Sequence, residues 1–394
     1  MPWTECRVMD QKLQFIARLI EGEKMAPLCR EFGITRPTGY KIWNRYKKLG
    51  EMALVEQKRT PHRYANSLPV EVEALILSLK REYSNWGAPK IREKIIKKFP
   101  DVKVPATSTI HAVLDRNGLV KHRKGRKRYK SKGTNLSDVK KPNELWCADY
   151  KGEFMMGNKN YCYPLTITDQ ASRYLIACEG QTGTNEVFAF ETFTRAFQEF
   201  GLPDAIRTDN GVPFASGNSF YNLTKLSVWW MRLGIQIERI KPGCPQQNGR
   251  HERMHLTLKQ EATRPPRANL IAQQETFDKF QEVFNKERPH QGIDNKYPSE
   301  IYVPSTRKFE KPEPLFYPFH DKTITVSQCG RICDRGLKVS LSKAFAGVEV
   351  GIKEMEDGVW VVSFLDYDLG YFDDKGKRVE PIEDPFGLYI KNGV

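Results

Sequence analysis

The chain has 394 residues and a formal net charge of +15, with 39% hydrophobic and 28% charged residues. That length is enough for two to four domains with cores of their own. No apolar run approaches the roughly 18 residues that a membrane span needs, and the N-terminal MPWTECRVMDQK has no apolar segment of the signal-peptide kind. We therefore expect no membrane span, no membrane partner and a cytoplasmic location.

The positive charge is confined to the front of the chain. Residues 1–133 contain 30 Lys and Arg against 13 Asp and Glu, whereas the remaining residues contain 33 against 35. A basic segment joined to a near-neutral one predicts that the front binds a polyanion while the rest does something else. A solubilising surface is the alternative, but it rarely concentrates so strongly in one part of a chain.

The cysteines give no sign of a disulfide framework. The eight lie at positions 6, 29, 147, 162, 178, 244, 329 and 333. Such scattered spacing is typical of reduced thiols in a cytosol. Cys329 and Cys333 form the only close pair, and no histidines stand beside them at zinc spacing, so the sequence does not favour a zinc site.

Residues 1–60 have the pattern of a helix-turn-helix DNA-binding domain. Apolar spacing predicts helices at 11–20 and 25–32, a break at Gly33, and a third helix that Thr35 caps and that ends at Lys48. The third helix would present these residues to a major groove: Arg36, Thr38, Lys41, Asn44, Arg45 and Lys48. Its packing residues would be Tyr40, Ile42, Trp43 and Tyr46. A protein-contact module of three helices is the alternative.

A second helical DNA-binding domain is predicted at residues 61–120, followed by a basic linker at residues 121–142. Helical periodicity covers 70–80, 88–99 and 108–117, and Gly118 ends the last helix. The linker has seven Lys and Arg in residues 121–130, which predicts salt-sensitive contact with phosphates. Its candidate DNA-binding residues are Lys121, Arg123, Lys124, Arg126, Lys127 and Arg128. A nuclear-localisation run would look the same.

From residue 143 to residue 305 the pattern is that of an α/β domain. Strands are predicted at 145–150, 161–168, 174–179, 204–208 and 235–240, with helices at 185–200, 247–263 and 271–286. Asp149 closes the first strand, Asp209 follows the fourth, and Glu252 lies on the helix that begins near Asn248 and Gly249. Each acid alone also fits an ordinary turn or helix start. Three acids that arrive on two strand ends and a helix can converge, and hard divalent cations choose such oxygen ligands.

These motifs together resemble the catalytic core of DDE transposases and integrases. The resemblance rests on WCADYKGEF around Asp149, TDNGVPF around Asp209, QNGRHERMHLTLKQE around Glu252, and NKERPHQG at 285–292. Within that superfamily the chain is most similar to IS481/IS3-like insertion-sequence transposases. One departure is the 42 residues between Asp209 and Glu252, a longer interval than in many relatives. The extra length falls at 215–233, where we expect an inserted or extended helix.

The resemblance implies a multidomain α+β protein with tandem helix-turn-helix units, a ribonuclease-H-like core and a small C-terminal SH3-like β-barrel. It implies that Asp149, Asp209 and Glu252 are catalytic residues that hold two Mg²⁺ ions, with Mn²⁺ as a substitute. It further implies 3′-end cleavage and strand transfer on DNA, with the terminal inverted repeats of a mobile element and a target duplex as partners. A homodimer or higher oligomer on DNA, in a prokaryotic nucleoid-associated setting, completes the expectation.

Two features of the back half remain. Lys259 lies two turns beyond Glu252 on one helix face, so it could contact the phosphate of a bound DNA end, although a solvated charged stripe is the alternative. After a linker at 306–320, residues 321–394 are predicted to hold five short strands, at 323–327, 337–341, 348–353, 359–364 and 370–373. A structure-specific nuclease and a DNA-binding regulator derived from a transposase are the other functions that we consider.

Overall fold

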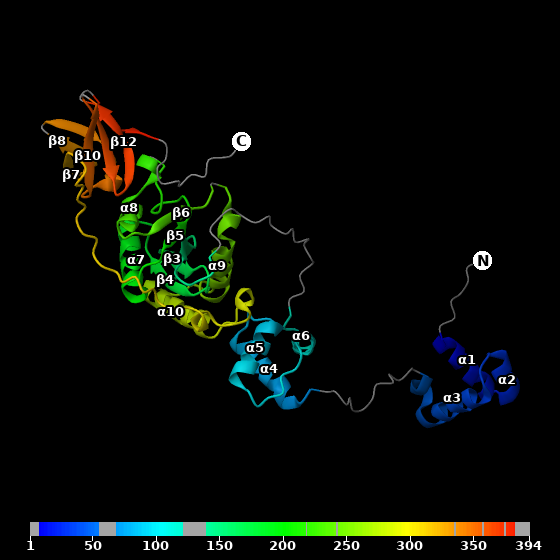
Figure 1. The fold of residues 1–394 in the computed structure, drawn as a ribbon. Coiled ribbons are helices and arrows are strands. Elements are labelled where there is room, and N and C mark those ends of the chain that lie inside the picture. The colour runs from blue at the N-terminus through cyan, green and yellow to red at the C-terminus, as the bar shows by residue number, and fades with distance from the viewer. Residues whose placement is uncertain are drawn as a thin grey trace, which may run out of the picture. The chain divides into compact units, whose positions relative to one another are not determined.

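The computed structural model describes residues 8–54, 68–120 and 139–382, apart from the single residues 218, 242, 335, 357, 374 and 375. The chain divides into two compact units, Met1–Pro69 and Val70–Val394 (Figure 1). The six predicted linker contacts, Lys121 to Arg128, lie outside the described residues. Among the described helices, none has the length and apolar character to cross a membrane.

The first unit is the predicted set of three helices. They are α1 Val8–Ile20, α2 Met25–Glu31 and α3 Arg36–Leu49, followed by a 3₁₀ turn, Gly50–Leu54. The Thr35 hydroxyl accepts a hydrogen bond from the Thr38 amide, which caps α3 as the sequence predicts. Gly39 lets α3 approach α2 closely, because a Cβ there would stand 2.5 Å from Cys29 Sγ.

The second unit begins with three more helices. They are α4 Val70–Glu82, α5 Ala88–Lys98 and α6 Thr107–Arg116, each within two residues of its predicted span. Ile76, Ile91 and Ile110 are fully buried among them. Contacts tie this bundle to the domain that follows. Lys94 Nζ lies 2.7 Å from the Glu287 carboxylate, and Lys97 Nζ lies at the same distance from Glu300.

A mixed sheet forms the centre of the unit. Its strands are β1 Leu145–Tyr150, β2 Phe154–Met155, β3 Tyr161–Asp169, β4 Leu175–Gln181, β5 Ala205–Thr208 and β6 Gln236–Arg239. The strand order is β2, β3, β1, β5, β6, and β4 also pairs with β3. Strand β5 lies parallel to both β1 and β6. This is the ribonuclease-H-like order that the resemblance implies. The two-residue β2 was not predicted.

Helices cover both faces of the sheet (Figure 1). On one face, α7 Glu186–Phe200 and α8 Lys225–Arg232 pack on Trp146, Ala148 and Ile167. On the other face, α9 Gly249–Glu261 and α10 Leu270–Lys286 pack on Cys162, Leu175 and Cys178. Side chains alternate along a strand, and Trp146 and Ala148 face α7 and α8. The Asp149 side chain therefore points to the opposite face, which α9 covers.

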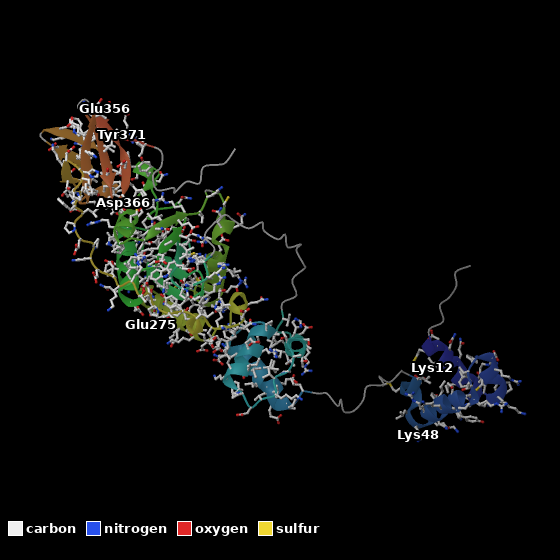
Figure 2. All side chains as sticks on the ribbon, in the orientation of Figure 1. Lys12, Lys48, Glu275, Glu356, Asp366 and Tyr371 are labelled. Atoms are coloured by element: carbon white, nitrogen blue, oxygen red, sulfur yellow. The ribbon has the colours of Figure 1, made fainter. Side chains whose placement is uncertain are left out.

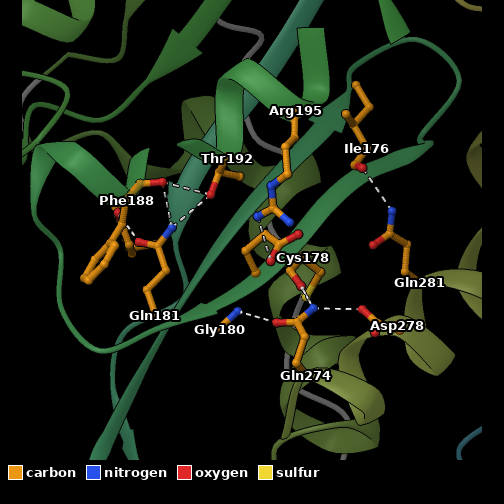
Figure 3. Close-up of polar contacts among 12 residues, drawn as sticks. Ile176, Cys178, Gly180, Gln181, Phe188, Thr192, Arg195, Gln274, Asp278 and Gln281 are labelled. Atoms are coloured by element: carbon orange, nitrogen blue, oxygen red, sulfur yellow. Dashed lines mark hydrogen bonds and ion pairs between the residues drawn. The ribbon is translucent and has the colours of Figure 1, made fainter. Parts of the chain in front are cut away.

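Side-chain amides of α10 cover the outer edge of β4 (Figure 3). Gln274 accepts from the Gly180 amide at 2.8 Å and donates to the Cys178 carbonyl at 3.0 Å. Gln281 donates to the Ile176 carbonyl at 2.9 Å. Asn285 both accepts from the Leu175 amide and donates to its carbonyl. These amides replace the neighbouring strand that an edge strand lacks.

Residues 215–233, where we expected an inserted or extended helix, hold the eight-residue α8 and a 3₁₀ turn, Phe220–Asn222, with loop segments before and between them. Phe220 and Leu223 are buried in the core of the C-terminal β region, which holds this loop in place. A capping box between Thr224 and Ser227 then starts α8.

The C-terminal region is built from strands, as predicted. A five-stranded sheet has the order β13, β12, β11, β10, β7, and β8 and β9 form a hairpin. Their bounds are β7 Lys322–Thr325, β8 Arg331–Asp334, β9 Leu337–Ser340, β10 Glu349–Glu356, β11 Val359–Phe364, β12 Tyr367–Asp373 and β13 Glu380–Pro381. Strands β8 and β13 were not predicted. Sheet and hairpin share one hydrophobic core.

Candidate active site

Asp149 stands near the end of β1, one residue before the strand stops. The neighbouring β5 runs parallel to β1, with Leu145 paired to Ala205, so both strands end at the same edge of the sheet. Asp209 is the first residue after β5 and therefore arrives beside Asp149. The parallel pairing thus brings together two acids that lie far apart in the sequence.

Local turn chemistry fixes the loop of Asp209. The Gly211 amide donates to Asp209 Oδ1 at 3.1 Å, and the Asn210 side chain donates to the Ile240 carbonyl at 2.7 Å. A Cβ on Gly211 would stand 3.0 Å from Asp209 Oδ2, which is tighter than ordinary contact. Asn210 and Gly211 therefore shape this loop, as the sequence predicts.

Glu252 enters from the first turn of α9 and is exposed. A 3₁₀ turn, Pro245–Asn248, leads directly into that helix. Glu252, Asp149 and Asp209 line one open cleft of about 380 Å³, together with Lys241 and Asn248. Asn248 Oδ1 is buried there and has no hydrogen-bond partner among the described residues.

Negative charge is crowded in this cleft. Burial, together with the charges of Asp209 and Glu252, raises the pKa of Asp149 to about 7, against an opposing hydrogen bond from the Tyr150 amide. Burial also raises the pKa of Asp209, although the Gly211 amide opposes the shift. An arrangement of carboxylates that repel one another suits a bound cation.

Two buried histidines of α9 lie beneath Asp149. The Thr166 hydroxyl donates to the Asp149 carbonyl at 3.0 Å and also contacts His251 Nε2 at 2.8 Å and His255 Nε2 at 2.7 Å. Because the hydroxyl has a single hydrogen, both histidines donate Nε2–H to it. His251 Nδ1 then accepts from the Thr168 hydroxyl at 2.7 Å.

This network keeps both histidines neutral. Burial lowers the pKa of His251 to about 3 and that of His255 to about 2. His255 Nδ1, which carries no hydrogen in this tautomer, lies 3.7 Å from Asp149 Oδ2, beyond hydrogen-bond distance. The network therefore holds Asp149 through its backbone carbonyl, which accepts from Thr166.

Asp149, His251 and His255 also place one ligand atom each within 4.8 Å of one another. Both nitrogens of His251 are already used by threonine hydroxyls, so this histidine has no lone pair for an ion. The three carboxylates offer the oxygen donors that Mg²⁺ and Mn²⁺ prefer. Asp149, Asp209 and Glu252 therefore fit a hard divalent cation better than the histidine set does.

Basic residues border the cleft. Burial lowers the pKa of Lys151, and the charge of Lys259 lowers it further, while Asp149 opposes the shift. Lys151 and Lys259 thus lie close enough to interact beside Asp149. Lys259 is exposed, as a DNA contact requires. Sequence reasoning missed Lys151, Lys241 and His251. Lys151 and His251 stand close to Asp149 and Glu252 in the sequence, but no motif marks them, and Lys241 reaches the cleft only because it follows β6.

One finer prediction for the first unit was wrong. Tyr40 was assigned to the packing face of α3 and is 52% exposed, whereas Ile42, Trp43 and Tyr46 do pack on the core of the first unit. These three residues continue a buried stripe that starts at Gly39, and Tyr40 is turned about 100° away from Gly39 around the helix.

The predicted DNA-contacting residues of α3 form an exposed face. Five are exposed: Arg36, Thr38, Lys41, Asn44 and Lys48. Figure 2 labels Lys48 on the first unit. Arg45 is half-buried, and its Nη2 atom has no hydrogen-bond partner among the described residues. A role for these residues in binding DNA stays a prediction.

Comparison with protein families agrees with this geometry. Residues 139–245 and 233–298 match models described as integrase core domain. This chain carries an integrase core. Before the integrase core, residues 11–62 match a helix-turn-helix domain and residues 38–114 a homeodomain-like domain. After it, residues 321–380 match the C-terminal domain of the IS481 family transposase.

Two proteins similar to this chain share about a quarter of its residues or fewer over the aligned part. Over 221 residues the chain is 23% identical to an insertion element IS476 uncharacterized 39.2 kDa protein of Xanthomonas euvesicatoria, covering 56% of this chain and 61% of that one. It is 25% identical over 162 residues to an insertion element IS407 uncharacterized 31.7 kDa protein of Burkholderia multivorans, covering 41% of this chain and 55% of that one. The chain thus spans little more than half the length of these relatives.

A solved structure of the HTLV-2 integrase catalytic core domain in complex with magnesium is also similar. It covers 41% of this chain and 98% of its own, with 17% identity and a TM-score of 0.33.

Proposed function

We propose that this chain is a DNA transposase of insertion-sequence type that cleaves the 3′ ends of a mobile element and joins them to target DNA. The observation that carries the proposal is the meeting of Asp149, Asp209 and Glu252 in one cleft. The integrase-core and helix-turn-helix matches support it. The terminal inverted repeats, the target duplex and a second copy of the chain would be its partners.

In this proposal the three carboxylates hold two divalent cations. When bound, a pair of Mg²⁺ ions, or Mn²⁺ as a substitute, activates water or a 3′-hydroxyl as the nucleophile and stabilises the departing 3′-oxygen. Asp149 and Asp209 supply ligands from rigid strand ends, and Glu252 supplies one from a helix. Such placement limits how far the ligands can move during the reaction.

Other residues would position the DNA and the acids. The Thr166 hydroxyl holds the backbone of Asp149 in place, and the buried His255 lies beside the carboxylate. Lys151 and Lys259 are suited to contact phosphates next to the scissile bond, because both are cations beside the cleft. The exposed face of α3 would read the element end, so recognition and chemistry belong to different parts of the chain.

The deciding experiment is Asp209→Asn, tested on a labelled duplex that carries the inverted repeat bordering the gene. The variant should lose strand transfer in Mg²⁺ and keep end binding, because it removes metal-binding charge without touching the basic front. Asp294→Asn is the matched control, since this Asp is exposed in a left-handed turn that Asn also adopts. Retained joining by Asp209→Asn would defeat the assignment.

The same assay separates the alternative functions. A structure-specific nuclease would cut the duplex but never join a free 3′ end to a second DNA. A transposase-derived regulator would bind the end and do neither, although all three acids are present in this chain.

A further inference from the structure

A second cavity, of about 390 Å³, uses a different face of α9. Glu252 lines the acidic cleft, whereas Arg250, Arg253 and Thr257 line the second cavity. The spacing of these three residues, i, i+3 and i+7, makes one stripe, and Arg253 is turned about 100° from Glu252. The helix α9 therefore separates the acidic cleft from the second cavity.

Five cations face this cavity, and they come from separate elements. Lys90 comes from the first turn of α5, Arg250 and Arg253 from α9, Arg173 from the turn after β3, and Arg288 from the end of α10. Basic residues from distant parts of the sequence therefore meet in one hollow of the size typical of small-ligand sites.

Little negative charge balances them. Arg288 is held by Glu261 through two contacts of 2.7 and 2.9 Å. Asp169 lines the cavity, but its oxygens already accept bonds from the Asn143 amide and from Ser172. Among the residues that the structure describes, the remaining four cations have no carboxylate at salt-bridge distance.

Two arginines are forced together at one carbonyl. Arg173 Nη1 lies 3.0 Å and Arg250 Nη1 lies 3.4 Å from the same Gln170 oxygen. Burial lowers the pKa of Arg173 to about 10, and the charge of Arg250 adds to the shift. Like charges held this close gain from an anion between them.

The Lys90 ammonium and the Arg253 guanidinium form no salt bridge or hydrogen bond with the described part of the chain. Burial, together with the charges of Arg288 and Arg253, lowers the pKa of Lys90 to about 7, against an opposing effect of Glu261. A half-buried ammonium group without a bonded partner is costly unless an anion joins it.

Two aromatic rings also line the cavity. Phe284 and His290 meet edge to face with their ring centroids 4.6 Å apart. Burial lowers the pKa of His290 to about 3, so the ring is neutral at physiological pH. Cations and aromatic rings are the two elements that hold an unpaired nucleotide, through its phosphate and its base.

We propose that this cavity binds one unpaired nucleotide of a DNA strand, with its phosphate on Lys90 and Arg253 and its base against Phe284 and His290. The proposal rests on the proposed function, because it takes DNA as the ligand. The nucleotide would lie across α9 from the reacting phosphate, on the order of 10 Å away. It would also fasten α5 of the helical bundle to α9 of the integrase core.

The test uses the full chain in EDTA, so that no metal is bound by the acids. Thymidine 5′-monophosphate, inorganic phosphate and thymidine are titrated separately by calorimetry. We expect the nucleotide to bind about tenfold or more tightly than either fragment. Lys90→Gln and Arg253→Gln should each weaken it by about tenfold or more, the loss of one charge-assisted contact.

Lys98→Gln is the matched control, because Lys98 lies on the same helix as Lys90, is exposed and does not line the cavity. It should change the affinity by less than about twofold. Arg253 is exposed, so its variant tests the site even if the Lys90 variant fails to fold. Unchanged affinity in Arg253→Gln, or inorganic phosphate that binds as tightly as the nucleotide, would overturn the proposal.

The two proposals fail in different ways. Asp209→Asn should bind the nucleotide as the wild type does, since the assay contains no metal. Nucleotide binding that follows these expectations in a protein unable to join DNA would refute the transposase function and leave the cavity assignment standing. Normal strand transfer, with equal nucleotide affinity in all variants, would refute the cavity assignment and leave the transposase function standing.

Discussion

Asp149 is the acid whose ionisation depends most on its surroundings. Its pKa is raised from 3.8 to about 7, chiefly by burial and then by Asp209. The folded protein therefore holds this proton more tightly than the unfolded chain does. As pH rises from about 4 through about 7, stability from this group is lost, because a buried carboxylate must become charged.

A divalent cation should reverse that loss. We expect Mg²⁺ to raise the midpoint of thermal unfolding more at about pH 8 than at about pH 6, because protons compete with the ion for Asp149. Differential scanning fluorimetry with NaCl of equal ionic strength as the control would measure this. Asp149→Asn should abolish the difference, and an equal shift at both pH values would contradict the expectation.

Thr166 is the centre of the polar network under the site. Thr166→Val would leave three groups without their partner: the Asp149 carbonyl and the two histidine Nε2 atoms. We expect a loss of roughly 2–4 kcal/mol in the free energy of unfolding and slower strand transfer.

Thr168→Val is the natural comparison for Thr166→Val, since it removes a single contact, the one to His251 Nδ1. Urea denaturation of both variants would rank them. A Thr168 variant that is less stable than the Thr166 variant would show that the network is centred elsewhere.

The three acids of the site could be predicted from the sequence, whereas the residues that pack beneath Asp149 could not. Asp209 and Glu252 stand beside Asn-Gly pairs, and Asp149 closes an apolar strand, so local patterns mark all three. His251 looks like any residue early in a helix. Its role depends on the register that sets Thr166 opposite Asp149, which no local pattern encodes.

The helix α10 contacts the sheet through side-chain hydrogen bonds to the backbone of β4. Asn285 is 3% exposed and makes both bonds to the backbone of Leu175. Asn285→Ala should lower the free energy of unfolding by roughly 1–3 kcal/mol, because it leaves the buried Leu175 amide unpaired, whereas the Leu175 carbonyl keeps its bond from Gln281.

Glu282→Ala on the same helix should change stability by less than about 0.5 kcal/mol, since its pairing with Lys286 is at the surface. Chemical denaturation of both variants gives the comparison. Equal losses would mean that general helix propensity, and not the cover of β4, accounts for the effect.

Long, regular elements were predicted closely, and the strands that were missed are all short. The helices α5, α7 and α10 and the strand β1 lie within a residue or two of their predicted spans, because their apolar periodicity is strong. Strands β2, β8 and β13 have two to four residues and show no such period. The loop before α8 could not be foreseen, because Phe220 is buried in a core that forms about a hundred residues later in the chain.

For the molecule as a whole, the basic front and the acidic cleft should be separable by mutation. Replacing both Arg36 and Lys41 with Gln should weaken end binding about 10- to 100-fold and lower the salt slope by about two. The same charge change at Lys308 and Lys311, both exposed, should have a much smaller effect. Fluorescence anisotropy across a salt series would show whether the affinity follows α3 or only the net charge.

The side-chain amides of α10 that bond to β4 also affect how copies of the chain can pair with one another. A sheet edge with free amides and carbonyls invites another chain to add a strand, and here α10 has already taken those groups. If copies of the chain gather on one stretch of DNA, as proposed above, they would find this side of the sheet already covered and could separate again afterwards.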